Sequence, residues 1–177
     1  MPVLDVRRHA QRSDRSDQAS ALSAAGRAMA ERLAKAGPRY ALVVSSPLVR
    51  AKETAELVGG RLDSVEPGLL PDLSLVLTDA RYEALRTLSG YAELLEMEDQ
   101  ARTFAEEQLA AWSRIASGVG EREHALAVSH GGLIELPAVS LARRIGGTLT
   151  GPPFSYCEGV RVTYERGAAA RIEALRV

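Results

Sequence analysis

Arginine and histidine side chains follow the ends of three predicted strands. Arg8 and His9 end the first strand, and Arg50 stands just beyond the Ser-Ser-Pro run at 45–47. His130 follows a third strand. Guanidinium groups match phosphate oxygens in bidentate fashion, and a neutral imidazole is a nucleophile. These residue types therefore indicate a site that binds an oxyanion and attacks it.

The elements that must position these residues alternate between strand and helix. The sequence predicts strands at residues 3–7, 41–44, 64–66 and 125–128, and helices at 23–35, 49–58, 93–117 and 133–144. Such alternation is typical of a parallel sheet with helical crossovers, in which the carboxyl ends of the strands share one crevice. We therefore expect an α/β three-layer sandwich, with a mostly parallel central sheet flanked by helices, whose crevice brings the arginines and histidines together.

Three other segments complete the predicted fold. Ser23 is the expected N-cap of the helix at 23–35. Residues 160–164 and 170–177 are predicted to form a closing hairpin, and residues 69–90 have an irregular pattern. Asp5 and Arg7 share one face of the first strand, which is unusual for a buried central strand.

Composition excludes several classes of protein. The 177 residues fit a single domain (1–177), with a formal net charge of −1 and therefore no global basic field for nucleic acid or acidic membranes. The single cysteine, Cys157, cannot form an internal disulfide, and no Cys/His cluster has zinc-ligand spacing. The sequence shows no signal peptide and no membrane-spanning run, so we expect a cytoplasmic protein without metal or cofactor.

Four motifs in the chain match one known family. Arg8-His9-Ala10 resembles the Arg-His-Gly signature of the histidine phosphatase (phosphoglycerate-mutase-like) superfamily. Leu-Ser-Ala-Ala-Gly at 22–26 looks like its Leu-Thr-x-x-Gly helix start, and residues 45–55 are similar to its second signature. Ser-His-Gly-Gly at 129–132 matches the third, so the motifs occur in the family's order.

This resemblance implies roles for individual residues. His9 would be the nucleophile that forms a phosphohistidine, and Arg8, Arg50, His130 and Gly131 would hold the phosphoryl group. The implied activity is that of a metal-independent phosphomonoesterase acting on a phosphorylated small molecule or phosphoprotein.

The resemblance also implies a role for Arg12 and a candidate for the proton donor. The run from Arg8 to Asp14 is similar to the Arg-His-Gly-x-Arg-x-Asp variant of a protein tyrosine phosphatase branch, in which Arg12 would contact phosphate. That branch's catalytic glutamate would fall at Pro71, and a one-residue slip gives Asp72 the role of proton donor. Glu66 and Glu83 are alternatives.

Two other functions remain open at this point. A phosphoglycerate-mutase-type phosphotransferase is disfavoured because the chain is short and lacks evident insertions that would grip a sugar phosphate. A non-catalytic phospho-ligand binder would keep the arginines but lack a working proton donor, and the ambiguity around Asp72 keeps that hypothesis open. Specificity is expected to lie in residues 73–98 and 146–158.

Overall fold

The computed structural model describes residues 1–70, 72, 76 and 78–177. Its strands form one sheet in the order β3-β2-β4-β1-β5-β6. The strands are β1 (Val3–Arg8), β2 (Leu42–Ser45), β3 (Ser64–Val65), β4 (His124–Ser129), β5 (Gly159–Glu165) and β6 (Ala168–Leu175). β1 to β4 run parallel and β5 and β6 are antiparallel, which confirms the mostly parallel α/β sandwich.

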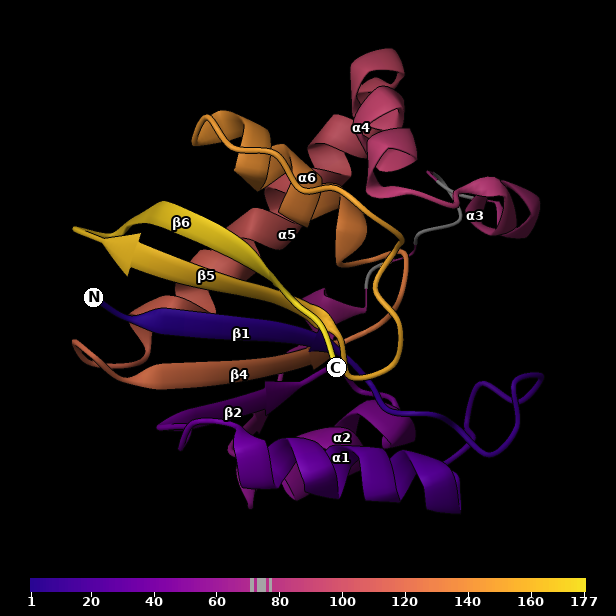
Figure 1. Cartoon of the computed structure of the whole chain (residues 1–177), viewed down its shortest axis with the longest axis vertical. Coiled ribbons are helices and arrows are strands. Elements are labelled where there is room, and N and C mark those ends of the chain that lie inside the picture. The colour runs from indigo at the N-terminus through magenta and orange to yellow at the C-terminus, as the bar shows by residue number, and fades with distance from the viewer. Residues whose placement is uncertain (71, 73–75, 77) are drawn as a thin grey trace.

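Helices cover both faces of the sheet (Figure 1). On one face lie α1 (Ala24–Ala36) and α2 (Val49–Gly59), and on the other lie α4 (Leu88–Met97), α5 (Asp99–Ser117) and α6 (Glu135–Arg144). The short η1 (Pro67–Leu69) and α3 (Asp79–Ala84) lie toward the carboxyl ends of the parallel strands. Two apolar cores result, one on each side of the sheet. No helix of the described chain is long and apolar enough to span a membrane.

The start of α1 is fixed against the chain that follows His9. Ser23 caps the helix by accepting a hydrogen bond from the Gly26 amide, as predicted. A Cβ at Gly26 would lie 2.0 Å from the Gln11 carbonyl oxygen, so only glycine allows this approach. The Leu-x-x-x-Gly motif therefore packs the helix against the backbone that carries the first histidine.

The prediction of one helix at 93–117 is wrong, because Glu98 interrupts it. Glu98 has extended backbone angles (φ −130°, ψ 121°) and separates α4 from α5. Both helices pack against α6, which a single straight helix could not do. No glycine or proline marks this break, so tertiary packing decides it.

The last two strands of the chain form the predicted hairpin. β5 and β6 are joined by Arg166 and Gly167, whose φ values are 51° and 80°. Two successive positive φ angles are typical of the tight turns whose twist matches that of the flanking strands. The hairpin extends the sheet beyond β1, on the side away from β2.

Candidate active site

Three parallel strands bring their last residues to one place. Arg8 of β1 pairs with Ser129 of β4, and the His9 amide donates to the Ser129 carbonyl at 2.9 Å. The Ser46 amide donates to the Val128 carbonyl at 2.9 Å, which fixes the end of β2 beside β4. The His9 and His130 rings therefore lie side by side in a tilted arrangement, with centroids 5.2 Å apart and an interplanar angle of 57°.

The His9 ring is buried, and its hydrogen bonds define its tautomer. Nδ1 lies 2.7 Å from the Ala10 carbonyl oxygen. Because a carbonyl only accepts, Nδ1 carries the proton, and Nε2 of the neutral ring is an unprotonated acceptor. Nε2 accepts from Nε of Arg50 at 3.1 Å. The lone pair needed for nucleophilic attack thus faces the guanidinium expected to hold a phosphoryl group.

The second histidine is held by a residue that the sequence analysis left without a role. His130 Nε2 lies 2.6 Å from the Ser46 hydroxyl oxygen, and both residues are buried. His130 Nδ1 and Arg8 Nε are buried without a hydrogen-bond partner among the described residues. Buried polar groups without partners are rare and costly, and an oxyanion bound at this site would give both nitrogens a partner.

The arginines come from different elements and have different neighbours. Arg8 donates from Nη1 to the Phe154 carbonyl at 2.9 Å and lies 4.8 Å above the Tyr156 ring centroid. Arg50 donates to both oxygens of Gln18, at 2.6 Å to the backbone carbonyl and 3.1 Å to Oε1. Gln18 therefore presents two oxygens to Arg50 where a phosphoryl group would present its own.

Arg12 lies in the loop that also carries Gln18. It donates from Nη2 to the Arg15 carbonyl at 2.6 Å, and its Nη1 lies 3.5 Å from Gln18 Oε1, the oxygen that also accepts from Arg50. The structure thus brings Arg12 to the same site as Arg8, His9 and Arg50.

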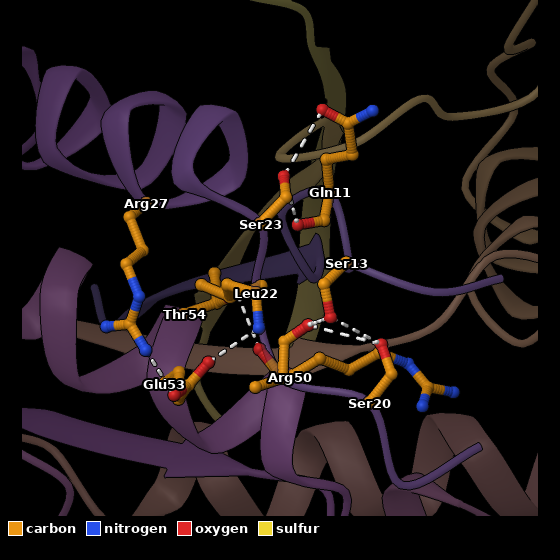
Figure 2. A network of polar contacts seen from close by, with 10 residues as sticks. Gln11, Ser13, Ser20, Leu22, Ser23, Arg27, Arg50, Glu53 and Thr54 are labelled. Carbon is orange, nitrogen blue, oxygen red and sulfur yellow. Dashed lines mark hydrogen bonds and ion pairs between the residues drawn. The ribbon is translucent and has the colours of Figure 1, made fainter. Parts of the chain in front are cut away.

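The loop between His9 and α1 is tied to both helices of its face (Figure 2). Glu53 of α2 accepts from the Leu22 amide at 2.7 Å and from Arg27 of α1 at 2.5 Å. Thr54 accepts from the Ala10 amide at 3.0 Å and donates to the Arg50 carbonyl at 2.7 Å. The second signature therefore supplies Thr54, which links the residue after His9 to the Arg50 backbone, and Glu53, which holds the loop against α1.

Gly131 allows Arg8 to approach the His130 loop. A Cβ at Gly131 would lie 2.7 Å from both Cζ of Arg8 and the Tyr82 hydroxyl. Any other residue would displace one of these groups. Tyr82 of α3 and Tyr156 thus flank Arg8, and both belong to the segments expected to determine specificity.

A buried carboxylate group holds the loop that follows His130. Glu135 is fully buried, and it accepts from the Gly132 amide at 2.7 Å and the Phe154 amide at 3.0 Å. Burial raises the pKa of Glu135. The same carboxylate therefore fixes the His130 loop and the segment whose carbonyl accepts from Arg8. Nothing in the local sequence distinguishes Glu135 from an ordinary helix glutamate.

Burial and positive charge keep both histidines neutral. Burial, with the charges of Arg50 and Arg8, lowers the pKa of His9 from 6.5 to about 3 despite the hydrogen bond to Ala10. Burial and the neighbouring basic groups lower the pKa of His130 to about 2. Burial also lowers the pKa of Arg50 to about 10, so this guanidinium stays charged at neutral pH.

These shifts predict the protonation and acid stability of the protein. In histidine NMR spectra of the ligand-free protein, His9 and His130 should stay neutral well below pH 6.5. Since both pKa values are lowered by folding, their contribution is complete above pH 6.5 and lost as pH falls toward about 3. Urea unfolding at a series of pH values should show a shallower acid loss for His9→Gln than for the wild type. An imidazolium signal from His9 at neutral pH would contradict this assignment.

The three candidate proton donors lie in different surroundings. Asp72 is exposed and lines a cavity against α5 with Asp99 and Glu107. The histidines and arginines of the site do not line this cavity. Glu66 accepts from the Gly68 amide at 3.0 Å as the cap of η1. Glu83 follows Tyr82 in α3, and its side chain lies outside the described part of the chain, as does Pro71. The structure therefore does not bring Asp72 together with His9.

The described residues contain no group of three or more histidine, cysteine or carboxylate side chains that could hold a metal ion. Arg8, Arg12 and Arg50 bring positive charge to the site.

Comparisons with known proteins agree with this arrangement. The family model of the histidine phosphatase superfamily (branch 1) matches residues 6–74, which include Arg8, His9 and Arg50. A search of curated proteins found no match.

Solved structures share the fold over nearly the whole chain. A phosphoglycerate mutase from Bacillus anthracis is 19% identical, with a TM-score of 0.70, 98% of this chain covered and 92% of that one. A phosphoserine phosphatase from Entamoeba histolytica, in complex with 3-phosphoglyceric acid, is 16% identical, with a TM-score of 0.68 and coverages of 100% and 98%. A mycobacterial glucosyl-3-phosphoglycerate phosphatase with inorganic phosphate is 23% identical, with a TM-score of 0.61 and coverages of 98% and 95%. The chain therefore shares the phosphoglycerate-mutase-like fold, and its residues 6–74 are similar to the histidine phosphatase superfamily (branch 1).

Proposed function

We propose that the protein is a phosphomonoesterase that transfers the phosphoryl group of its substrate to His9 and then to water. The observation that carries the proposal is the unprotonated Nε2 of His9, which lies 3.1 Å from Nε of Arg50. A lowered pKa keeps this nitrogen nucleophilic at neutral pH, where an ordinary histidine is partly protonated.

The proposed reaction has two steps. His9 Nε2 forms a bond to phosphorus as the bond to the ester oxygen breaks, and the leaving oxygen takes a proton. Water then attacks phosphorus, the P–N bond breaks, the histidine regains its lone pair, and the carboxylate that protonated the leaving oxygen takes a proton from the water. Arg8 and Arg50 stabilise the charge on the phosphoryl oxygens in both steps, since phosphoryl transfer depends largely on positioning and electrostatics.

Two assays separate this function from its alternatives. Steady turnover of p-nitrophenyl phosphate distinguishes an enzyme from a phospho-ligand binder. Incubation with 3-phosphoglycerate and a trace of the bisphosphate would reveal a mutase through the appearance of 2-phosphoglycerate. Hydrolysis of the first substrate without isomerisation of the second supports the phosphatase.

Activity should need no metal ion. The guanidinium groups already supply the positive charge that a metal would bring to the phosphoryl oxygens. We expect p-nitrophenyl phosphate turnover to be unchanged in EDTA, and vanadate and inorganic phosphate to inhibit competitively. Activity that EDTA removes and a divalent cation restores would contradict this prediction.

The proton donor is expected to reveal itself by its dependence on the leaving group. An alkoxide needs protonation as it departs, whereas p-nitrophenolate hardly does. Asp72→Asn, Glu66→Gln and Glu83→Gln should therefore be compared on an alkyl phosphate and on p-nitrophenyl phosphate. One of the three should lower kcat for the alkyl ester by about tenfold or more relative to the aryl ester.

Each outcome of that comparison assigns the role differently. A selective loss for Asp72→Asn supports the donor predicted from sequence, and a loss for Glu83→Gln assigns it to α3. Equal losses on both substrates for a variant would indicate that its carboxylate positions phosphate or supports structure.

A further inference from the structure

A basic cavity lies apart from the residues of the His9 site. It has a volume of about 910 Å³ and lies between α1 and the β5-β6 hairpin. Arg7 lines it, whereas Arg8 faces the phosphoryl site, because successive residues of a strand point to opposite faces. None of Arg8, His9, Arg50 and His130 lines this cavity. It is therefore separate from the proposed active site.

The cavity wall carries more positive than negative charge. Arg7, Arg32, Arg161 and Arg176 all line it. Asp5 binds Arg161 through two hydrogen bonds, at 2.7 and 2.9 Å, and Glu158 binds Arg176 at 2.7 Å.

The two remaining arginines are poorly neutralised. Arg7 is 5% exposed and donates from Nη1 to the Cys157 carbonyl at 2.8 Å, but its nearest carboxylate oxygen is 3.9 Å away on Asp5 and its Nε has no hydrogen-bond partner among the described residues. Arg32 is exposed and forms no ion pair within the described chain. This local excess of charge stands in a protein whose formal net charge is −1.

Apolar side chains form the rest of the wall. Met29 and Leu33 of α1 face Leu175 and Val177 across the cavity. Sites for small molecules typically have volumes of roughly 300–1,000 Å³, mostly apolar walls and a few polar groups that fix orientation. The combination of an apolar wall and an unbalanced arginine pair fits a ligand with an apolar body and one anionic group.

We propose that this cavity binds an amphipathic organic monoanion. Its anionic group would lie at Arg32 and the edge of Arg7, and its apolar body would lie against Met29, Leu33 and Leu175. The inference is independent of the chemistry proposed for His9.

Octanoate is a suitable probe, because it joins an eight-carbon apolar body to one carboxylate. Its binding should be measured by isothermal titration calorimetry on the full chain, with saturating inorganic phosphate present to occupy the His9 site. We expect one octanoate per chain, bound at least about tenfold more tightly than octanol, which lacks the charge. Loss of octanoate binding in phosphate would assign it to the His9 site and overturn the proposal, as would equal binding of octanol.

Three substitutions in α1 locate the site. Arg32→Glu reverses a charge in the cavity wall, and Ala36→Trp fills the cavity from an exposed position. Lys35→Glu makes the same charge change on an exposed residue of the same helix that does not line the cavity. The first two should weaken octanoate binding by about tenfold or more, and the third should not. All three should keep wild-type turnover of p-nitrophenyl phosphate. Equal weakening by Lys35→Glu and Arg32→Glu would show a general charge effect and overturn the proposal.

Discussion

His9→Ala is expected to lower kcat for p-nitrophenyl phosphate by about 10⁴-fold or more, because it removes the proposed acceptor of the phosphoryl group. The ring is buried at the end of β1, with Nδ1 fixed by the Ala10 carbonyl and Nε2 beside Arg50. No other described side chain presents an unprotonated imidazole nitrogen to that guanidinium. Stopped assays with a sensitive phosphate readout would measure the residual rate.

The matched control for this substitution is His124→Ala. His124 begins β4, at the end of the strand opposite to Ser129, and its side chain is half-buried. Its loss should leave turnover close to that of the wild type. Since truncating the buried His9 ring also leaves a cavity, thermal unfolding should be compared for both variants. Substantial turnover by folded His9→Ala would show that His9 is not the phosphoryl acceptor.

Arg50→Ala and Arg8→Ala are each expected to lower kcat/KM by about 10²-fold or more. Removing one preorganised donor to a developing charge typically costs about 2.7–4 kcal/mol of transition-state stabilisation. Arg50 contacts Nε2 of His9, the proposed nucleophile, and Arg8 is oriented by the Phe154 carbonyl and the Tyr156 ring. Steady-state kinetics on p-nitrophenyl phosphate would measure both effects.

Arg27→Ala provides the control for the loss of an arginine near this loop. Arg27 pairs with Glu53 on the outer side of the same helix pair, and its side chain is 47% exposed. Its removal should change kcat/KM far less than either loss at the site. If both Arg8→Ala and Arg50→Ala cost less than about tenfold, neither guanidinium contacts the transferring phosphoryl group.

Much of the fold could be predicted because local signals and the overall fold agree. The Ser23 cap of α1, the short apolar strands and the closing hairpin all stand close to where the structure has them. The break at Glu98 could not be predicted, because it results from the packing of α4 and α5 against α6 and has no sequence breaker.

The residues of the site could likewise be predicted only in part. The residues at strand ends follow from topology, since parallel strands share one carboxyl edge. Ser46, Gln18 and Glu135 were not singled out, because their roles depend on hydrogen bonds between segments far apart in the chain. Their residue types alone are common in loops and on helices.

The most direct test of the proposed mechanism is the chemical identity of the phosphorylated residue. Protein mixed with ³²P-labelled substrate and quenched during turnover should carry one phosphate that is labile in acid and stable in alkali, as expected of a phosphohistidine. Peptide mapping should place it on His9, and His9→Ala should carry none. Acid-stable label on Ser46 or another serine, or on an aspartate, would contradict the mechanism proposed for this site.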